Sequence, residues 1–181
     1  MIDYSVEVKL PPASAINGGM TYPKPNQMIS LLGSPRTSYG DDCLPVTNLK
    51  LKKLMVQSYD VGPFNVSGLK LVAEALKRVF DKLKVEKPEL YAQIGTAGML
   101  CCRRIRGSAS TPSNHSWGAA IDFKINGKLD QRGDGYCQKG LLELYPYMHN
   151  EGFYWGAEYK GPYEDSMHFE WAWETLLKNY G

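Results

Sequence analysis

One long amphipathic segment limits the possible folds of this chain more than any other feature. From Leu69 to Leu83 the apolar residues recur at helical spacing, while lysines, an arginine and acids occupy the opposite face. The helix is preceded by a predicted loop from Asp60 to Gly68, and Ser67 near the end of this loop is placed to cap the helix. Pro88 lies beyond the end of the helix. Such a helix needs a second layer to cover its apolar face.

Shorter segments separated by turn signals predict the strands of that layer. Met99–Arg104 and Ala119–Ile125 have strand-like sequences, and Asn126-Gly127 predicts a tight hairpin turn. The last strand is expected at Met167–Trp171. Strands of this length, connected by turns, favour an antiparallel sheet.

Two further helices complete the predicted fold. One is expected from Gly140 to about Asn150, interrupted or bent at Pro146, and the other from Trp173 to Asn179. Residues 1–45 are rich in Pro, Gly, Ser and Asn, which predicts an irregular arm packed on the domain, with a short helix around Gln27–Leu32. The expected fold class is α+β, with an antiparallel sheet packed against helices.

Composition excludes several classes of function. The chain has 181 residues and a net charge of +2, which favours one globular domain and argues against a strongly basic nucleic-acid binder. No run approaches the ~20 apolar residues that a membrane-spanning helix needs. The first residues carry acids and alternate in polarity, so we expect no cleavable signal peptide and no membrane insertion.

The four cysteines leave two alternatives open. They show no CxxC spacing, and Cys101 and Cys102 are adjacent, so they cannot easily bond to each other. A bridge from Cys43 or Cys137 to one of that pair is one alternative, and four free buried thiols is the other.

Two motifs carry the chemistry. His115, Asp122 and His168 would form a set of two histidines and one carboxylate, a three-ligand shell that leaves a catalytic zinc one open position for water. Gly118 and two alanines lie between the first two of these residues, and such small side chains allow close packing around an ion. Asp165, three residues before His168, is placed to act as a general base.

These segments resemble the VanX/VanY-like zinc peptidases, which include D-alanyl-D-alanine carboxypeptidases and L-alanyl-D-glutamate endopeptidases. Ser113 and His115 start the first motif of that family; the glycine departs from the family spacing, at Gly118, three residues after the histidine, and Asp122 follows at the expected offset. Asp165-Ser166-Met167-His168 fills the second motif. The resemblance covers roughly residues 95–173. It implies a Hedgehog/DD-peptidase-like fold, one zinc ion bound by His115, Asp122 and His168, and Asp165 as the catalytic base. An aspartate at that position is more similar to the endopeptidase branch.

The resemblance also implies an arginine that stabilises the substrate and the transition state. The family pattern favours Arg103, with Arg106 second; a strand would place Arg104 and Arg106 on the opposite face from Arg103. A solvated basic edge is the alternative. Ser113 and Trp171 are further candidates for substrate binding, although a loop cap and a core position, respectively, would also explain them.

Two remaining motifs have simpler interpretations. Arg132-Gly133-Asp134 spells an integrin-binding tripeptide, but its setting predicts a polar turn. His149 lies near the end of a helix, where a contact with the helix dipole explains it.

The function we expect is hydrolysis of a peptide bond in bacterial peptidoglycan stem peptides, with residues 46–181 as the zinc peptidase catalytic domain. A non-catalytic zinc-containing binding or signalling module of the same fold is the alternative. We expect a monomer that acts in the periplasm or cell wall after phage lysis or export by another machine, as an endolysin or an antibacterial effector. An export carrier and an immunity protein are the protein partners that these roles would add.

Overall fold

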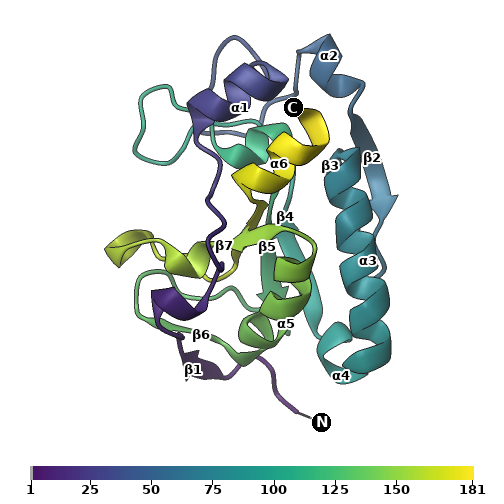
Figure 1. The fold of residues 1–181 in the computed structure, drawn as a ribbon, viewed down its shortest axis with the longest axis vertical. Coiled ribbons are helices and arrows are strands. Elements are labelled where there is room, and N and C mark those ends of the chain that lie inside the picture. The colour runs from purple at the N-terminus through teal and green to yellow at the C-terminus, as the bar shows by residue number, and fades with distance from the viewer. Residues whose placement is uncertain (1) are drawn as a thin grey trace.

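The computed structural model describes residues 2–181 and shows the predicted α+β architecture (Figure 1). No helix in residues 2–181 is long and apolar enough to cross a membrane. The helices are α1 (Pro25–Leu32), α2 (Leu49–Lys52), α3 (Lys70–Glu86), α4 (Pro88–Tyr91), α5 (Lys139–Asn150) and α6 (Trp173–Tyr180). The strands are β1 (Glu7–Lys9), β2 (Met55–Asp60), β3 (Asn65–Leu69), β4 (Ile94–Gly98), β5 (Ala120–Ile125), β6 (Tyr136–Gln138), β7 (Phe153–Trp155) and β8 (His168–Trp171).

The central sheet has four antiparallel strands in the order β4-β5-β8-β7. Successive side chains of a strand point to opposite faces, so the register assigns each residue to a face. Asp122 pairs with His168, and Glu170 pairs with Ala120 on one side and Tyr154 on the other. The other face is apolar and contains Ile121, Phe123, Ile125, Phe153, Trp155, Phe169 and Trp171, all buried.

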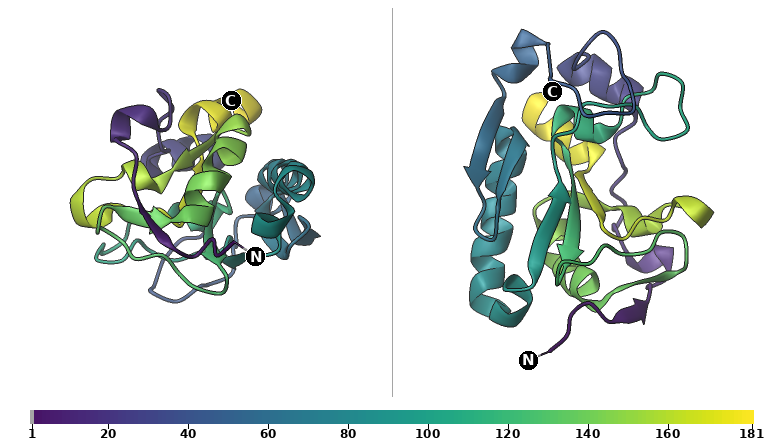
Figure 2. Two further views of the ribbon diagram at one scale, coloured as in Figure 1. Left: turned by 90° about the horizontal axis from the view of Figure 1, so that it is seen from below. Right: turned by 180° about the vertical axis from the view of Figure 1, so that it is seen from behind.

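Helices α3 and α5 pack around the apolar face (Figure 1). Phe80 of α3 lies 6.0 Å from Phe123, and Tyr145 of α5 stacks on Trp155 at 5.0 Å, measured between ring centroids. The additional views show α3 and the β2–β3 hairpin together on one side of the molecule (Figure 2). The polar face of the sheet is therefore left for the predicted site.

The predicted apolar face of α3 is confirmed, but the predicted capping residue and the predicted loop before the helix are wrong. Val72, Leu76 and Phe80 are buried as expected. Ser67 does not cap the helix, because it lies within β3, where its hydroxyl accepts a hydrogen bond from the backbone of Ser58 at 3.0 Å. The segment predicted as a loop before the helix instead forms most of a hairpin, because β3 pairs antiparallel with β2.

The strand predicted at Met99–Arg104 is not present, because the regular ladder ends at Gly98. The register shifts between Thr96 and Gly98, and Gly98 has a φ of 128°, so the chain leaves the sheet there. The predicted segment makes only isolated bridges, from Cys102 to Leu44 and from Arg104 to Pro112.

The other strand and helix predictions in the second half of the chain agree with the structure. β5, β8, α5 and α6 lie within one or two residues of their expected bounds, and Pro146 lies inside α5. Asn126 and Gly127 have φ values of 53° and 75° and close a tight turn from Ile125 to Lys128.

The N-terminal arm runs along one side of the domain from β1 up to α1 (Figure 1). Its strand β1, which the sequence did not indicate, pairs antiparallel with β6. Tyr4, Ile16 and Met28 are buried in the core, so the arm contributes to the packing of the domain. Helix α1 contains the helix expected around Gln27–Leu32 and begins two residues earlier.

Candidate metal centre

Three side chains on the polar face meet at one point. His115 lies in a 3-10 turn (Asn114–Trp117), Asp122 lies in β5, and His168 begins β8. Asp122 Oδ1 is 2.9 Å from His168 Nδ1 and 3.4 Å from His115 Nε2. One donor atom from each residue lies within 4.8 Å of the others, so the three could hold a metal ion. The fold thus brings together the three predicted metal ligands.

The hydrogen bonds of His115 leave one of its nitrogen atoms free for this centre. Its Nδ1 lies 2.8 Å from the carbonyl oxygen of Met99, which can only accept a hydrogen bond. Nδ1 therefore carries a proton, and Nε2, which faces Asp122, is the nitrogen left as a possible metal donor. A backbone carbonyl in this position is typical of the partners that fix the orientation of metal-binding histidines.

Glu170 is a residue of the site that the sequence predictions missed. It is 1% exposed, and its Oε1 lies 3.5 Å from His168 Nε2, on the side of the ring away from Asp122. The hydroxyl of Tyr159 and the side-chain amide of Asn114 also donate to its carboxylate. Strand alternation contained the signal, because residues 168 and 170 must share a face.

The charges of the site stabilise one another. Burial opposes ionisation of Asp122, but its contacts with the two histidines outweigh burial and hold the pKa of this carboxyl well below its usual range. Burial likewise opposes a charge on His168, while its contacts with Asp122 and Glu170 raise its pKa. The site therefore keeps Asp122 as an anion, the form that binds metals.

Two close approaches of the backbone shape the first motif. Gly118 ends the 3-10 turn with a φ of 62°, and a Cβ at this position would lie 2.4 Å from the Cα of Gly68 in β3. A Cβ on Gly68 would in turn lie 2.7 Å from the carbonyl oxygen of Gly118. Only glycine at both positions allows the hairpin to press against the turn that carries His115.

The structure places Ser113 at the start of this turn. Its hydroxyl accepts a hydrogen bond from the backbone of His115 at 3.4 Å, and 9% of the residue is exposed. This contact is the loop cap considered from the sequence.

Asp165 lies in the segment that leads into β8. Its backbone carbonyl accepts a hydrogen bond from the backbone of His168 at 3.1 Å, and its side chain is 14% exposed. Burial raises the pKa of this carboxyl, and the nearby charges of His168 and Arg132 partly offset the rise. The charges of Asp122 and His115 also affect this pKa, so the Asp165 carboxyl lies within electrostatic range of the three donors.

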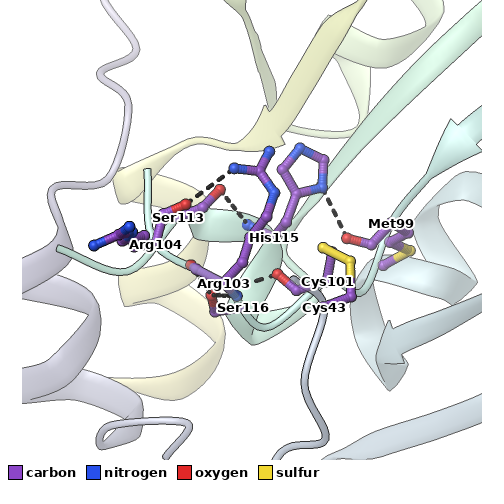
Figure 3. The surroundings of a disulfide bond; sticks show 8 residues. All are labelled: Cys43, Met99, Cys101, Arg103, Arg104, Ser113, His115 and Ser116. Carbon is purple, nitrogen blue, oxygen red and sulfur yellow. Dashed lines mark hydrogen bonds between the residues drawn. A yellow bond between two sulfur atoms is a disulfide. The ribbon is translucent and has the colours of Figure 1, made fainter. Parts of the chain in front are cut away.

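The arginines of the preceding loop differ in their surroundings. The backbone of Arg103 is held against the turn of His115 by hydrogen bonds with Ser116, at 3.0 and 3.1 Å. In Figure 3 its side chain and the His115 ring point the same way from the loop. Arg104 instead forms two hydrogen bonds with Asp41 of the arm, both at 2.8 Å. Arg106 is exposed in the following turn.

Trp171 is not brought to the metal centre. It is 3% exposed and lies on the apolar face of the sheet, where its ring centroid is 6.3 Å from that of Phe153. Because His168 and Glu170 occupy the alternate positions of β8, Trp171 must point away from them. The core position considered from the sequence is the one that the structure shows.

One of the alternatives for the cysteines is realised. Cys43 and Cys101 form a disulfide, while Cys102 and Cys137 are free and buried. The bond joins the arm to the loop that carries Arg103 (Figure 3), and the backbone of Cys101 donates to the carbonyl of His115 at 3.0 Å. The arm is therefore covalently tied to the support of the metal centre.

Comparison with known proteins agrees with the expected resemblance. A family model described as D-alanyl-D-alanine carboxypeptidase matches residues 106–171, which contain His115, Asp122, Asp165 and His168. This stretch is similar to that family of peptidases. A comparison of the chain with curated proteins finds no match.

Proposed function

We propose that this protein is a zinc-dependent peptidase that hydrolyses a peptide bond in the stem peptides of bacterial peptidoglycan. The observation that carries the proposal is the convergence of His115, Asp122 and His168, with the carboxyl of Asp165 within electrostatic range of all three. The family match over residues 106–171 supports the reaction class.

The donor set fits zinc. Two imidazoles and one carboxylate are common ligands of catalytic zinc, whereas calcium and magnesium prefer sites made of oxygen atoms alone. Nε2 of His115 is not used by the contact with Met99, and the carboxylate of Asp122 is ionised, the form that a metal ion requires. When bound, zinc would polarise the scissile carbonyl and lower the pKa of a water molecule.

The side chains around the centre then have separate roles. Asp165 accepts the proton of the attacking water and passes it to the leaving amine, as a general base and then a general acid. Its burial suits this task, because a raised pKa brings the carboxyl nearer to the pH at which it must both accept and donate. Arg103 faces the developing oxyanion or a carboxylate of the substrate, with Arg106 as the second candidate.

The bond that is cleaved defines two forms of this proposal. The description of the matched family favours removal of a terminal D-alanine, whereas the aspartate at position 165 favours the endopeptidase branch. Mass spectrometry of digested muropeptides separates them, because loss of one alanine and release of a whole stem peptide change the mass differently.

The disulfide supports action outside the reducing cytoplasm. Bonds such as Cys43–Cys101 form and persist in oxidising compartments, which include the bacterial periplasm. This agrees with a substrate in the cell wall, reached by phage lysis or through an export machine.

The central experiment replaces Asp165 in the zinc-loaded protein. D165N should keep about one zinc per chain. Its rate of hydrolysis of purified sacculi should fall by a factor of about 100 to 10,000, because general-base catalysis contributes about that much to the rate. D81N, on the exposed face of α3, is the matched control and should be fully active. Full activity of D165N would exclude the mechanism, and tight zinc binding by a wild-type protein without hydrolysis would favour a non-catalytic zinc module.

A further inference from the structure

A loop far from β8 in the sequence lies against the segment that carries Asp165. The loop contains Arg132-Gly133-Asp134, and the turn predicted there is present, since Asp134 Oδ1 accepts a hydrogen bond from the backbone of Tyr136 at 2.9 Å. Arg132 Nε lies 3.1 Å from Asp165 Oδ2. One member of the tripeptide thus contacts the residue proposed as the catalytic base.

The loop is attached to both sequence neighbours of Asp165. The carboxylate of Glu164 accepts hydrogen bonds from the backbones of Gly133, at 2.9 Å, and Gly135, at 3.4 Å. On the other side, the hydroxyl of Ser166 donates to the carboxylate of Asp130. The loop and the base therefore form one hydrogen-bonded unit.

The backbone of the loop packs directly on this segment. Gly133 has a φ of 73°, and a Cβ there would lie 2.9 Å from the Cα of Pro162. Its N–H also donates to the backbone carbonyl of Glu164 at 3.1 Å. The position of Arg132, the preceding residue, is consequently set by backbone contacts and does not depend on its own side chain.

The ion pair itself differs from an ordinary surface pair. The side chain of Arg132 is 44% exposed, but that of Asp165 is only 14% exposed. Asp165 Oδ1 is buried and has no hydrogen-bond partner among the residues that the structure describes. One carboxylate oxygen is held by the guanidinium, while the other is left free for a proton.

We propose that Arg132 is a positioning residue for Asp165, an inference that rests on the proposed function. By holding Oδ2, the guanidinium fixes the rotation of the carboxylate so that a lone pair of Oδ1 is directed toward the water that loses its proton. Without this contact the carboxylate rotates, and misplacing a catalytic group by about 1 Å can cost about 100-fold in rate.

The test compares three zinc-loaded variants on the same muropeptide. R132A should lower kcat by about 10- to 100-fold, with KM and zinc content close to wild type, since the arginine acts through the base. R132K should recover part of the loss. R78A removes a matched exposed arginine of α3, which pairs with Glu151, and should be unimpaired. Guanidinium ion at a non-denaturing concentration should restore activity to R132A, because the vacated site is open to solvent.

Each outcome decides the inference. Rescue of kcat by guanidinium or by lysine supports positioning by a cation. An unchanged kcat in R132A overturns it, and so does a loss of kcat that accompanies lost zinc or a lower melting temperature and that neither cation restores. If the wild-type protein does not hydrolyse muropeptides, the proposed function fails instead, and the two failures are thus distinguishable.

Discussion

The two faces of the central sheet are built from the same strands and serve opposite purposes. In β8, His168 and Glu170 point to the candidate metal centre, while Phe169 and Trp171 point into the core. A shift of one residue in the register would exchange the two sets. Accurate strand pairing is therefore a condition for both stability and chemistry, and adjacent residues should respond to mutation in different ways.

Breaking the apolar face should have the largest effect on folding. Phe169 is fully buried and lies 5.6 Å from Phe123 and 5.7 Å from Trp155, measured between ring centroids. We expect F169A to lower the free energy of unfolding by about 3–5 kcal/mol, because removal of a buried aromatic ring leaves a cavity. Urea denaturation of the zinc-loaded protein measures this.

His168, the residue before Phe169, lies on the polar face, so its replacement should affect metal binding more than folding. H168A should reduce the zinc content from about one ion per chain to near zero, because a proposed zinc ligand is removed. Denaturation in excess chelator compares the two without the contribution of the metal. An H168A chain as unstable as F169A under that condition would contradict the separation of the two faces.

The disulfide supports the polar face from outside the sheet. Its removal should have the next largest effect on the free energy of unfolding. C43S should lower the free energy of unfolding by about 2–4 kcal/mol, since a bond between residues 58 positions apart restricts the unfolded chain. Cys137, which is free and buried, provides the control C137A. Thermal unfolding with and without a reductant measures the difference, and a reductant that destabilises wild type and C43S equally would refute it.

Glu170 lies on the polar face beside His168 and should contribute to zinc affinity through that histidine. E170Q should weaken zinc binding by about 10- to 100-fold, because partners of metal-binding histidines contribute about this much. Competition with a zinc chelator measures the affinity. E174Q, in the following helix, removes an exposed glutamate and should bind zinc normally. Unchanged affinity in E170Q would restrict Glu170 to a packing role.

Asp130 is a buried carboxylate without histidine partners. Its titration should change the free energy of unfolding, and we expect this effect to be the smallest of those predicted. Burial raises its pKa from 3.8 to about 6. The folded protein then holds a proton that the unfolded chain has released, so this group lowers stability as pH rises from about 4 to about 6. Relative to D130N, wild type should lose roughly 1–3 kcal/mol over this interval. Parallel stability curves for the two proteins would contradict the assigned shift.

The parts of the site that could be predicted are those encoded by local spacing. His115 and Asp122 lie in one segment, and Asp165 and His168 lie in another, so two short motifs were enough to select them. The fold class followed in the same way from α3 and from the strands that became β5 and β8. Each of these elements has its pattern within about a dozen residues.

The parts that could not be predicted depend on contacts between distant segments. Arg132 and Asp165 are far apart in the sequence, and only the fold brings them together. The end of β4 at Gly98 depends on a bulge against β5, which no local pattern shows. Trp171 differs, since strand alternation alone separates it from His168 and could have excluded it from the site.

The contact between Gly68 and Gly118 has an evolutionary consequence. Each residue excludes a side chain on the other, so the constraint belongs to the pair and not to either position alone. A single substitution at either position meets backbone, and adaptation at one position requires the hairpin to move as a whole. Among relatives of this chain, the two positions should vary together, and a relative without the first glycine should also lack the close-packed hairpin.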